Sequence, residues 1–198
     1  MKLILVRHAQ SEANAKGIFQ DNTLGTPLSK QGIEQAKNLA LRLKDEKIDA
    51  IYSSEMKRAE ETANIIAKNH NVKVILDKRL NEFNSGTLRS KDELFNFFEK
   101  HRGEKGDEYF DVKTPGGESK RDHANKIESF LSEIIQKYKG TIIVISHGGT
   151  NKLFMGLMGH TPLTEAYKLK QENTCINELL FDDGKWIVHR LNCVKHLK

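Results

Sequence analysis

Short apolar runs alternate with helical patterns along much of this chain. Residues 2–6, 48–52, 72–76 and 141–145 are rich in β-branched and other apolar residues, as buried strands are. The stretches between them carry apolar side chains every three to four residues, which predicts helices. Because parallel strands need long crossover connections, this alternation predicts a parallel sheet with helices packed on it.

Several helices and one hairpin are expected around this sheet. Helices are expected at residues 29–44, 55–69 and 119–137, with Ser29 capping the first, and another begins at Gly149. The buried face of the first helix is expected to carry Ile33, Ala36, Leu39, Ala40 and Leu43. Near the end of the chain, Asp182-Asp183-Gly184 separates two strand-like runs and predicts a β-hairpin.

Two of the expected strands end in histidine. Arg7-His8 follows the first strand, and Ser146-His147-Gly148 follows the strand at 141–145. Ligands bind at the carboxyl ends of parallel strands, so both imidazoles and Arg7 are expected in one crevice. A guanidinium group grips phosphate oxygens in a bidentate fork, and an imidazole that titrates near neutrality can be a nucleophile, donor or acid. The pair therefore predicts phosphoryl chemistry.

Several ordered motifs resemble those of the histidine phosphatase superfamily, also called the phosphoglycerate mutase-like proteins. The resemblance rests on residues 5–14, 19–20, 27–29, 32–36, 52–63, 80–82, 115–119 and 146–148. These motifs extend over nearly the whole chain and are most similar to the phosphatase branch. The resemblance implies an α/β fold, a three-layer α/β/α sandwich with a mostly parallel sheet and a small cap insertion at about residues 82–117.

The resemblance implies a role for each of five residues. His8 is the expected nucleophile, because an imidazole that attacks phosphorus forms a phosphohistidine and divides one hard hydrolysis into two easier steps. Arg7, Arg58 and His147 are expected to hold the transferring phosphoryl group and to offset charge on its oxygens. Glu82 is expected to protonate the leaving alcohol and then to activate water.

Other polar residues divide into binding and structural candidates. Asn14 and Gln20 match positions that help to bind phosphate in the family, and Ser11 could add a hydroxyl. Glu118 and Ser119 are interpreted as structural, since a serine at a helix start satisfies free backbone amides. Neither Cys-x-x-Cys nor a paired histidine spacing is present, so no metal and no cofactor is expected.

The strand-helix rhythm stops between residues 82 and 117. Long insertions in compact domains usually build binding loops, so this segment is expected to form a cap that carries substrate specificity. Its turns are marked by Gly103, Gly106, Pro115, Gly116 and Gly117. Its aromatic residues, interpreted as packing the insertion rather than lining a pocket, are Phe95, Phe97, Phe98, Tyr109 and Phe110.

Composition limits the remaining functions. The 198 residues suit one domain, expected to span 1–198, and Cys175 and Cys193 are expected to be reduced thiols, with Cys175 packed in the interior. The net charge is +5, but Lys and Arg alternate with Asp and Glu, which indicates a solvated surface rather than a nucleic-acid site. No membrane contact is expected, and a cytoplasmic location follows by default. The expected partner is a small-molecule phosphate ester; the oligomeric state stays open.

Two functions remain as alternatives to phosphomonoester hydrolysis. A cofactor-dependent phosphoglycerate mutase uses the same core, but mutases carry Tyr and Asn-Lys where this chain has Ser85 and Asp92-Glu93. An acidic residue there would repel a second phosphate, although Arg89 and Lys91 could compensate in part. A non-catalytic phospho-ligand-binding protein is the second alternative. We favour a metal-independent phosphatase, because the complete set of expected catalytic residues is present.

Overall fold

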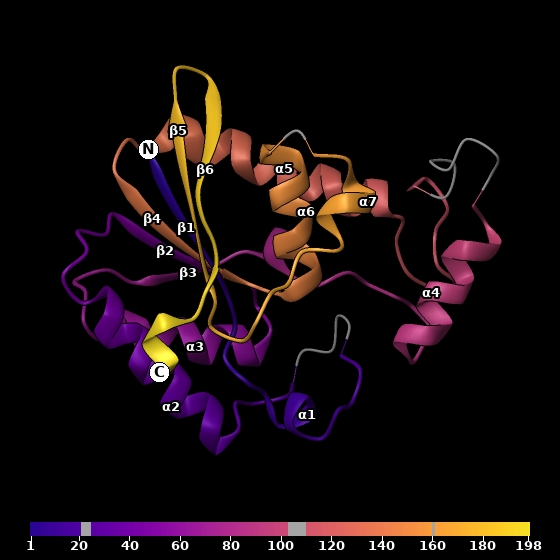
Figure 1. Cartoon of the computed structure of the whole chain (residues 1–198), viewed down its shortest axis with the longest axis horizontal. Coiled ribbons are helices and arrows are strands. Elements are labelled where there is room, and N and C mark those ends of the chain that lie inside the picture. Colours follow the sequence, from indigo (N-terminus) through magenta and orange to yellow (C-terminus); the bar gives the residue numbers. More distant parts are fainter. Residues whose placement is uncertain (21–24, 103–109, 160) are drawn as a thin grey trace.

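A six-stranded sheet forms the centre of the computed structural model, which describes residues 1–20, 25–102, 110–159 and 161–198. The strands lie in the order β3-β2-β4-β1-β5-β6 (Figure 1). They are β1 (Lys2–Arg7), β2 (Ala50–Ser53), β3 (Val74–Leu76), β4 (Thr141–Ser146), β5 (Ile176–Asp182) and β6 (Lys185–Cys193). The first four pair in parallel, whereas β5 and β6 add an antiparallel edge. The expected mostly parallel sheet is confirmed.

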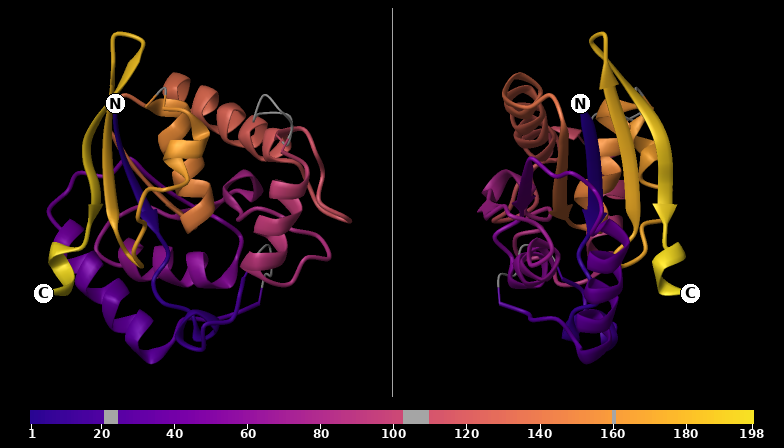
Figure 2. Two further views of the ribbon diagram at one scale, coloured as in Figure 1. Left: turned by 45° about the vertical axis from the view of Figure 1, so that its right-hand side comes forward. Right: turned by 90° about the vertical axis from the view of Figure 1, so that its left-hand side faces the viewer.

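Helices cover both faces of this sheet and complete the three-layer sandwich (Figure 2). Helices α2 (Lys30–Leu43) and α3 (Lys57–Ala67) pack on one face, and α5 (Lys120–Lys137) and α6 (Gly148–Met158) pack on the other. The shorter elements are α1 (Glu12–Ala15), α4 (Lys91–Lys100), α7 (Leu163–Ala166) and the 3₁₀ turns η1 (Lys78–Leu80) and η3 (Lys195–Leu197). Within the described residues, no helix has the length and apolar character needed to cross a bilayer.

Strand β1 is buried on both of its faces. Leu3 and Leu5 pack in the cluster with α5 and α6, whereas Ile4 and Val6 pack in the cluster with α2 and α3. Successive side chains of a strand point to opposite faces, so a continuous apolar run fits a strand between two helical layers. Burying each such side chain contributes roughly 1.5–3 kcal/mol, and this rigid centre fixes where the strand ends lie.

The start of α2 differs in one respect from the expectation. Ser29 caps the helix as expected, because its Oγ accepts from the amide of Gly32 at 3.0 Å. The prediction that Ile33 is buried was wrong: its side chain is 38% exposed, and Gly32 is buried instead. A Cβ at Gly32 would overlap the carbonyl of Gln10, so the close approach of the loop after β1 selects glycine at the inward position.

The insertion between residues 82 and 117 has its own small core. Phe98 and Phe110 are buried and pack with Phe83, Leu94, Phe97 and Leu163, which confirms that aromatics of the insertion pack it. Phe95 is 64% exposed and takes no part in this packing. Three of the residues singled out in the sequence, Gly103, Gly106 and Tyr109, lie outside the described residues. Helix α4 stands at the side of the sandwich, beyond α7 (Figure 1).

The residues that follow the insertion are structural, as expected. Ser119 caps α5 in a reciprocal arrangement with Asp122, in which each side chain accepts from the other residue's amide. Glu118 forms an ion pair with Lys126 of α5 and accepts from the amide of Asn84 at 2.9 Å. These contacts tie the insertion to α5.

The β-hairpin at the end of the chain is confirmed. Strands β5 and β6 pair antiparallel around Asp183 and Gly184, whose φ angles are 44° and 74°. Two consecutive residues with positive φ make the turn type that matches the twist of a tight hairpin.

Candidate active site

Strands β1 and β4 bring the two histidines together. They pair in parallel with Arg7 opposite Ser146, so the residues that follow the two strands are neighbours. The amide of His8 donates to the carbonyl of Ser146 at 2.9 Å, and the ring centroids of His8 and His147 lie 5.1 Å apart. Both side chains are buried. The carboxyl end of the sheet therefore holds both imidazoles side by side.

The backbone fixes the His8 ring. Its Nδ1 lies 2.7 Å from the carbonyl oxygen of Ala9. A carbonyl oxygen can only accept, so in the neutral ring Nδ1 carries the proton and Nε2 holds the lone pair. Ala9 is fixed in turn, because its amide donates to Oγ1 of Thr62 in α3 at 3.1 Å. His8 therefore has the tautomer that leaves Nε2 able to attack an electrophile.

Two guanidinium groups, one buried and one partly buried, act on this imidazole. Arg7 comes from the end of β1, and Arg58 comes from the first turn of α3, where its side chain is 1% exposed. Nη1 of Arg7 donates to the carbonyl of Gln171 at 2.6 Å, whereas its buried Nε has no hydrogen-bond partner among the described residues. Nη2 of Arg58 donates to Sδ of Met56 at 3.0 Å. Buried cations of this kind suit an anionic ligand.

The imidazoles of the site are neutral near neutral pH. Burial lowers the pKa of His8 well below its usual value, and Arg58 and Arg7 lower it further. Burial also lowers the pKa of His147 well below its usual value, with added lowering from Arg58 and His8. Arginine stays protonated in proteins, so the site combines fixed positive charge with two neutral nitrogen bases.

Hydrogen bonds also determine the tautomer of His147. Its Nε2 lies 2.8 Å from Oγ of Ser54, which follows β2. The single hydroxyl proton of Ser54 goes to Oδ1 of Asn81 at 2.8 Å, so Nε2 of His147 must be the donor. The buried Nδ1 of His147 has no hydrogen-bond partner within the described part of the chain. This nitrogen can therefore take up a proton and donate it to an anion.

The carboxyl group of Glu82 lies at the N-terminus of α6. Its Oε1 accepts from the amide and from the hydroxyl of Thr150, both at 3.0 Å, and from the amide of Phe83 at 3.2 Å. Its Oε2 accepts from the amide of Gly149 at 3.0 Å. Free amides at a helix start are suited to a carboxylate. This anchoring places Glu82 beside the residues that follow His147.

Ser11, Asn14 and Gln20 form one hydrogen-bonded group. Ser11 caps α1, since its Oγ accepts from the amide of Asn14 at 3.1 Å and donates to Oε1 of Gln20 at 2.6 Å. Oδ1 of Asn14 accepts from Nδ2 of Asn173 at 3.4 Å, and the same Nδ2 donates to the carbonyl of His8 at 3.0 Å. The structure thus connects Asn14 to His8 and gives Ser11 a capping role. Contact of these residues with phosphate stays a prediction.

The sequence did not reveal how Glu82 is held. A Cβ at Gly149 would lie 2.7 Å from Oε1 of Glu82, so glycine is needed for the carboxyl group to approach the helix. Thr150 adds both an amide and a hydroxyl. The run Gly148-Gly149-Thr150 directly after His147 was the available indication, because small and hydroxyl residues at a helix start favour anion binding there. No sequence pattern indicated that Ser54 contacts His147.

The cysteines are not candidates for catalysis, and the described residues hold no metal-binding cluster. Cys175 and Cys193 are free, and Cys175 is buried, as its interpretation as a packed residue requires. Burial raises the pKa of the Cys175 thiol to about 11, so it is an inert thiol rather than a nucleophile. In the part of the chain that the structure describes, no group of three or more His, Cys, Asp or Glu could hold a metal ion.

Known proteins are similar to this chain over almost its full length. The model of the histidine phosphatase superfamily (branch 1) matches residues 3–194. Phosphoserine phosphatase 1 of Hydrogenobacter thermophilus is 32% identical over 201 residues, covering 100% of this chain and 94% of that protein. The metal-independent phosphoserine phosphatase of Arabidopsis thaliana is 32% identical over 208 residues, covering 99% of this chain and 83% of that protein.

A solved structure agrees with these relatives. A mutant phosphoserine phosphatase from Entamoeba histolytica in complex with phosphoserine is 28% identical and has a TM-score of 0.84, covering 100% of this chain and 99% of that one. The sheet order and the paired histidines thus occur in a chain that the family model matches nearly from end to end. The chain belongs to branch 1 of the histidine phosphatase superfamily.

Proposed function

We propose that this chain is a metal-independent phosphomonoesterase that acts through a phosphohistidine at His8. The His8 ring carries the proposal: it is buried, its Nδ1 is fixed by the Ala9 carbonyl at 2.7 Å, and Arg58 and Arg7 act on it. A neutral imidazole with a fixed tautomer offers one lone pair at Nε2. The neighbouring guanidinium groups can hold the phosphate oxygens while that lone pair attacks.

The first step transfers the phosphoryl group to His8. Arg7 and Arg58 hold the phosphate oxygens and offset their charge, and Nδ1 of the neutral His147 takes up the proton that the phosphate monoanion brings and donates it back to one of the oxygens. The Nε2 lone pair forms the bond to phosphorus as the bond to the leaving oxygen breaks. The electron pair of that bond stays on the leaving oxygen, which takes a proton from Glu82 and departs as an alcohol.

The second step returns the enzyme to its starting state. Glu82, now a carboxylate, takes a proton from a water molecule, whose oxygen attacks phosphorus as the bond to Nε2 breaks. Inorganic phosphate leaves, and Glu82 holds the proton for the next cycle. We assign the proton to Oε2, because Oε1 already accepts three hydrogen bonds and Oε2 accepts one among the described residues.

The substrate that we propose is a small phosphate monoester with an acidic group, with phosphoserine as the first candidate. The names of two relatives and the ligand in the solved structure support this choice. Lys152 of α6 supports it too. Its Nζ donates to the carbonyl of Tyr167 at 2.8 Å, and its pKa, lowered mainly by burial, also responds to Glu82 and Arg7. A cation near these residues suits a substrate carboxylate.

We also propose that residues 82–117 act as a cap within one domain that spans 1–198. The ion pair of Glu118 with Lys126 and the bond of Glu118 to the Asn84 amide support a cap that is anchored at its end. Phosphoglycerate mutase activity remains the second candidate, because it uses the same core. Asp92 and Glu93, in the first turn of α4, disfavour it through repulsion of a second phosphate.

Transfer of label from radioactive phosphoserine to the protein tests the proposal. The native protein, quenched early in the reaction, should carry a label that is labile to acid and stable to alkali, and it should release inorganic phosphate. His8→Ala should carry none. His189→Ala is the matched control, since His189 is exposed on β6, and it should label normally.

Each result has a separate meaning. Label that persists in His8→Ala would contradict the assignment of the nucleophile. Label without release of inorganic phosphate would favour a mutase. A native protein that binds phosphoserine but neither labels nor hydrolyses it would be a phospho-ligand-binding protein.

A further inference from the structure

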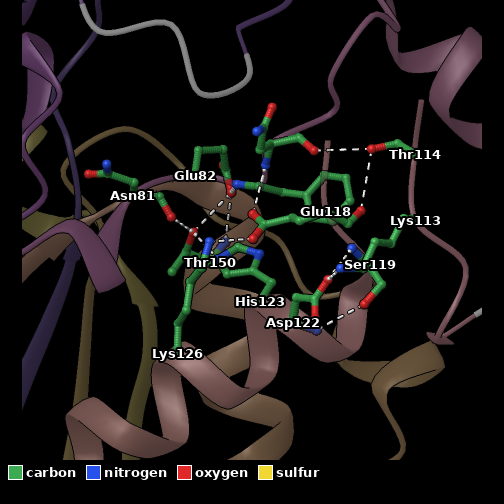
Figure 3. A network of polar contacts seen from close by, with 12 residues as sticks. Asn81, Glu82, Lys113, Thr114, Glu118, Ser119, Asp122, His123, Lys126 and Thr150 are labelled. Atoms are coloured by element: carbon green, nitrogen blue, oxygen red, sulfur yellow. Dashed lines mark hydrogen bonds and ion pairs between the residues drawn. The ribbon is translucent and has the colours of Figure 1, made fainter. Parts of the chain in front are cut away.

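A buried histidine that the proposed mechanism does not use lies behind Glu82. His123 of α5 is 1% exposed, and its Nε2 lies 3.3 Å from Oγ1 of Thr150. The ring of Phe83 packs against it with centroids 5.8 Å apart. Figure 3 shows His123, Thr150 and Glu82 in sequence from α5 towards the carboxyl group. Two hydrogen bonds, both made by the Thr150 hydroxyl, thus connect the imidazole to the proposed acid.

The hydroxyl of Thr150 has more acceptors around it than it has protons. It lies 3.0 Å from Oε1 of Glu82 and 3.1 Å from the carbonyl oxygen of Asn81. A carbonyl oxygen can only accept, and a carboxylate oxygen does the same, so the one hydroxyl proton goes to one of them. His123 must then be the donor to Oγ1, with its proton on Nε2.

The surroundings of His123 fit this tautomer. Burial lowers the pKa of His123, against opposing effects of the carboxyl groups of Glu82 and Glu118, so the ring is neutral near neutral pH. Its Nδ1 is buried without a hydrogen-bond partner among the described residues. The Nε2–H tautomer therefore places the proton of the ring where acceptors lie, at Oγ1 of Thr150 and at the neighbouring carbonyl oxygen of Asn81.

We propose that His123 and Thr150 are positioning residues for Glu82: the imidazole donates to the hydroxyl, and the hydroxyl donates to Oε1. The proposal rests on the assignment of Glu82 as acid and base. Oε1 then stays an acceptor throughout the cycle, and the proton that is given to the leaving oxygen and recovered from water resides on Oε2. Without the hydroxyl, Oε1 would keep only the amides of Thr150 and Phe83 as donors, so the preference of the proton for Oε2 would be weaker. A carboxyl group that carries its proton on Oε1 cannot protonate the leaving group.

Leaving-group dependence separates this role from a merely structural one. An alkyl phosphate needs a proton on its leaving oxygen, whereas an ester of a very acidic phenol departs with little help. Thr150→Val keeps the shape of the side chain and removes the hydroxyl. We expect the burst of phosphoenzyme formation with the alkyl ester to slow by about tenfold, the upper end of the effect of losing one hydrogen bond between neutral groups, and the burst with the aryl ester to change little.

Conservative variants and a matched control sharpen the test. Thr150→Ser keeps the hydroxyl and His123→Gln keeps a donor near the Nε2 position, so both should retain most of the alkyl-ester rate that Thr150→Val and His123→Leu lose. Thr114→Val is the control: Thr114 is buried in the same network, and its hydroxyl contacts the carbonyl oxygens of Asn84 and Glu118 but not Glu82. Its two ester rates should change by the same factor.

The outcomes distinguish this proposal from the one that it rests on. If Glu82→Gln slows the burst of phosphoenzyme formation equally with both esters, Glu82 is not the acid and the proposed function needs another one. If Glu82→Gln selectively slows the alkyl ester but Thr150→Val slows both equally, only the positioning role is overturned. If His123→Leu does not fold, the comparison of Thr150→Val with Thr150→Ser is sufficient. Equal alkyl-ester bursts in these two variants would overturn the positioning role.

Discussion

Gly149→Ala moves the proposed acid without removing it. Gly149 lies in the first turn of α6, and its amide donates to Oε2 of Glu82. Alanine is the better helix former by roughly 0.8–1 kcal/mol, so the helix itself should gain stability from the substitution. The atoms nearest to the added Cβ all belong to the carboxyl group of Glu82. Activity and stability are therefore expected to change in opposite directions.

The size of the effect follows from the geometry. The Cβ would lie 2.7 Å from Oε1 of Glu82, whereas ordinary contacts begin at 3.4 Å, so the carboxyl group must move by about 0.7 Å. The end of a glutamate side chain can make this movement, but it loses its alignment with the two amides of the helix start. Since a misplacement of about 1 Å can cost ~10²-fold in rate, we expect kcat for an alkyl phosphate to fall by ~10- to 10²-fold.

The neighbouring glycine supplies the control. A Cβ at Gly148 would lie 3.5 Å from Nε of Arg7, which is ordinary contact, so Gly148→Ala should retain nearly full activity. Steady-state hydrolysis of an alkyl phosphate and thermal unfolding would be measured for both variants. If Gly149→Ala has a native-like kcat and an unchanged Tm, catalysis does not depend on the position of the Glu82 carboxyl group at the start of α6, and the reasoning is refuted.

Two further predictions concern pH and metals. Because burial holds the pKa values of His8, His147 and His123 below 6.5, the unfolded chain binds protons near pH 6.5 that the folded chain does not. Stability is therefore greatest above pH 6.5, and the free energy of unfolding should fall below it by about 1.4 kcal/mol per pH unit for each imidazole. Urea unfolding at a series of pH values measures this slope, which His123→Gln should lower by one proton; a flat profile would contradict the buried neutral rings. Activity should be unchanged in excess EDTA, because the proposed mechanism takes from the guanidinium groups of Arg7 and Arg58 the positive charge that metal ions give other phosphatases; activity lost on chelation and restored by Mg²⁺ or Zn²⁺ would refute the mechanism.

The sequence was sufficient for the part of the molecule that depends on strand order. A buried apolar strand followed by histidine, found twice, predicts neighbours at one edge of a parallel sheet, and His8 and His147 lie there. The strands were predicted to within a few residues because their apolar runs are continuous. The hairpin was predicted because Asp183-Gly184 has the residues that a positive-φ turn selects.

The features that could not be predicted from the sequence depend on contacts between residues that are far apart along the chain. Ile33 fits an apolar helical face, yet the approach of the Gln10 carbonyl gives Gly32 the inward position. Periodicity cannot register such an approach from another segment. The Glu82 carboxyl group is likewise held by the first residues of α6, which are distant in the sequence. No local pattern around residue 82 indicates that Thr150 donates to it. Helices α1 and α7 have four residues each, too few for a periodic pattern.

The place of β4 in the sheet also has a consequence for biosynthesis. It lies between β1 and β2, yet both of those strands leave the ribosome long before it. Until residue 146 has been made, β1 and β2 have no partner on the sides that β4 will occupy. A nascent chain of this length therefore exposes three unpaired edges, both edges of β1 and one of β2, and the pairing that closes the gap spans most of the sequence. Folding should be slow and late in synthesis, and the nascent chain is a natural client for a chaperone that shields strand edges.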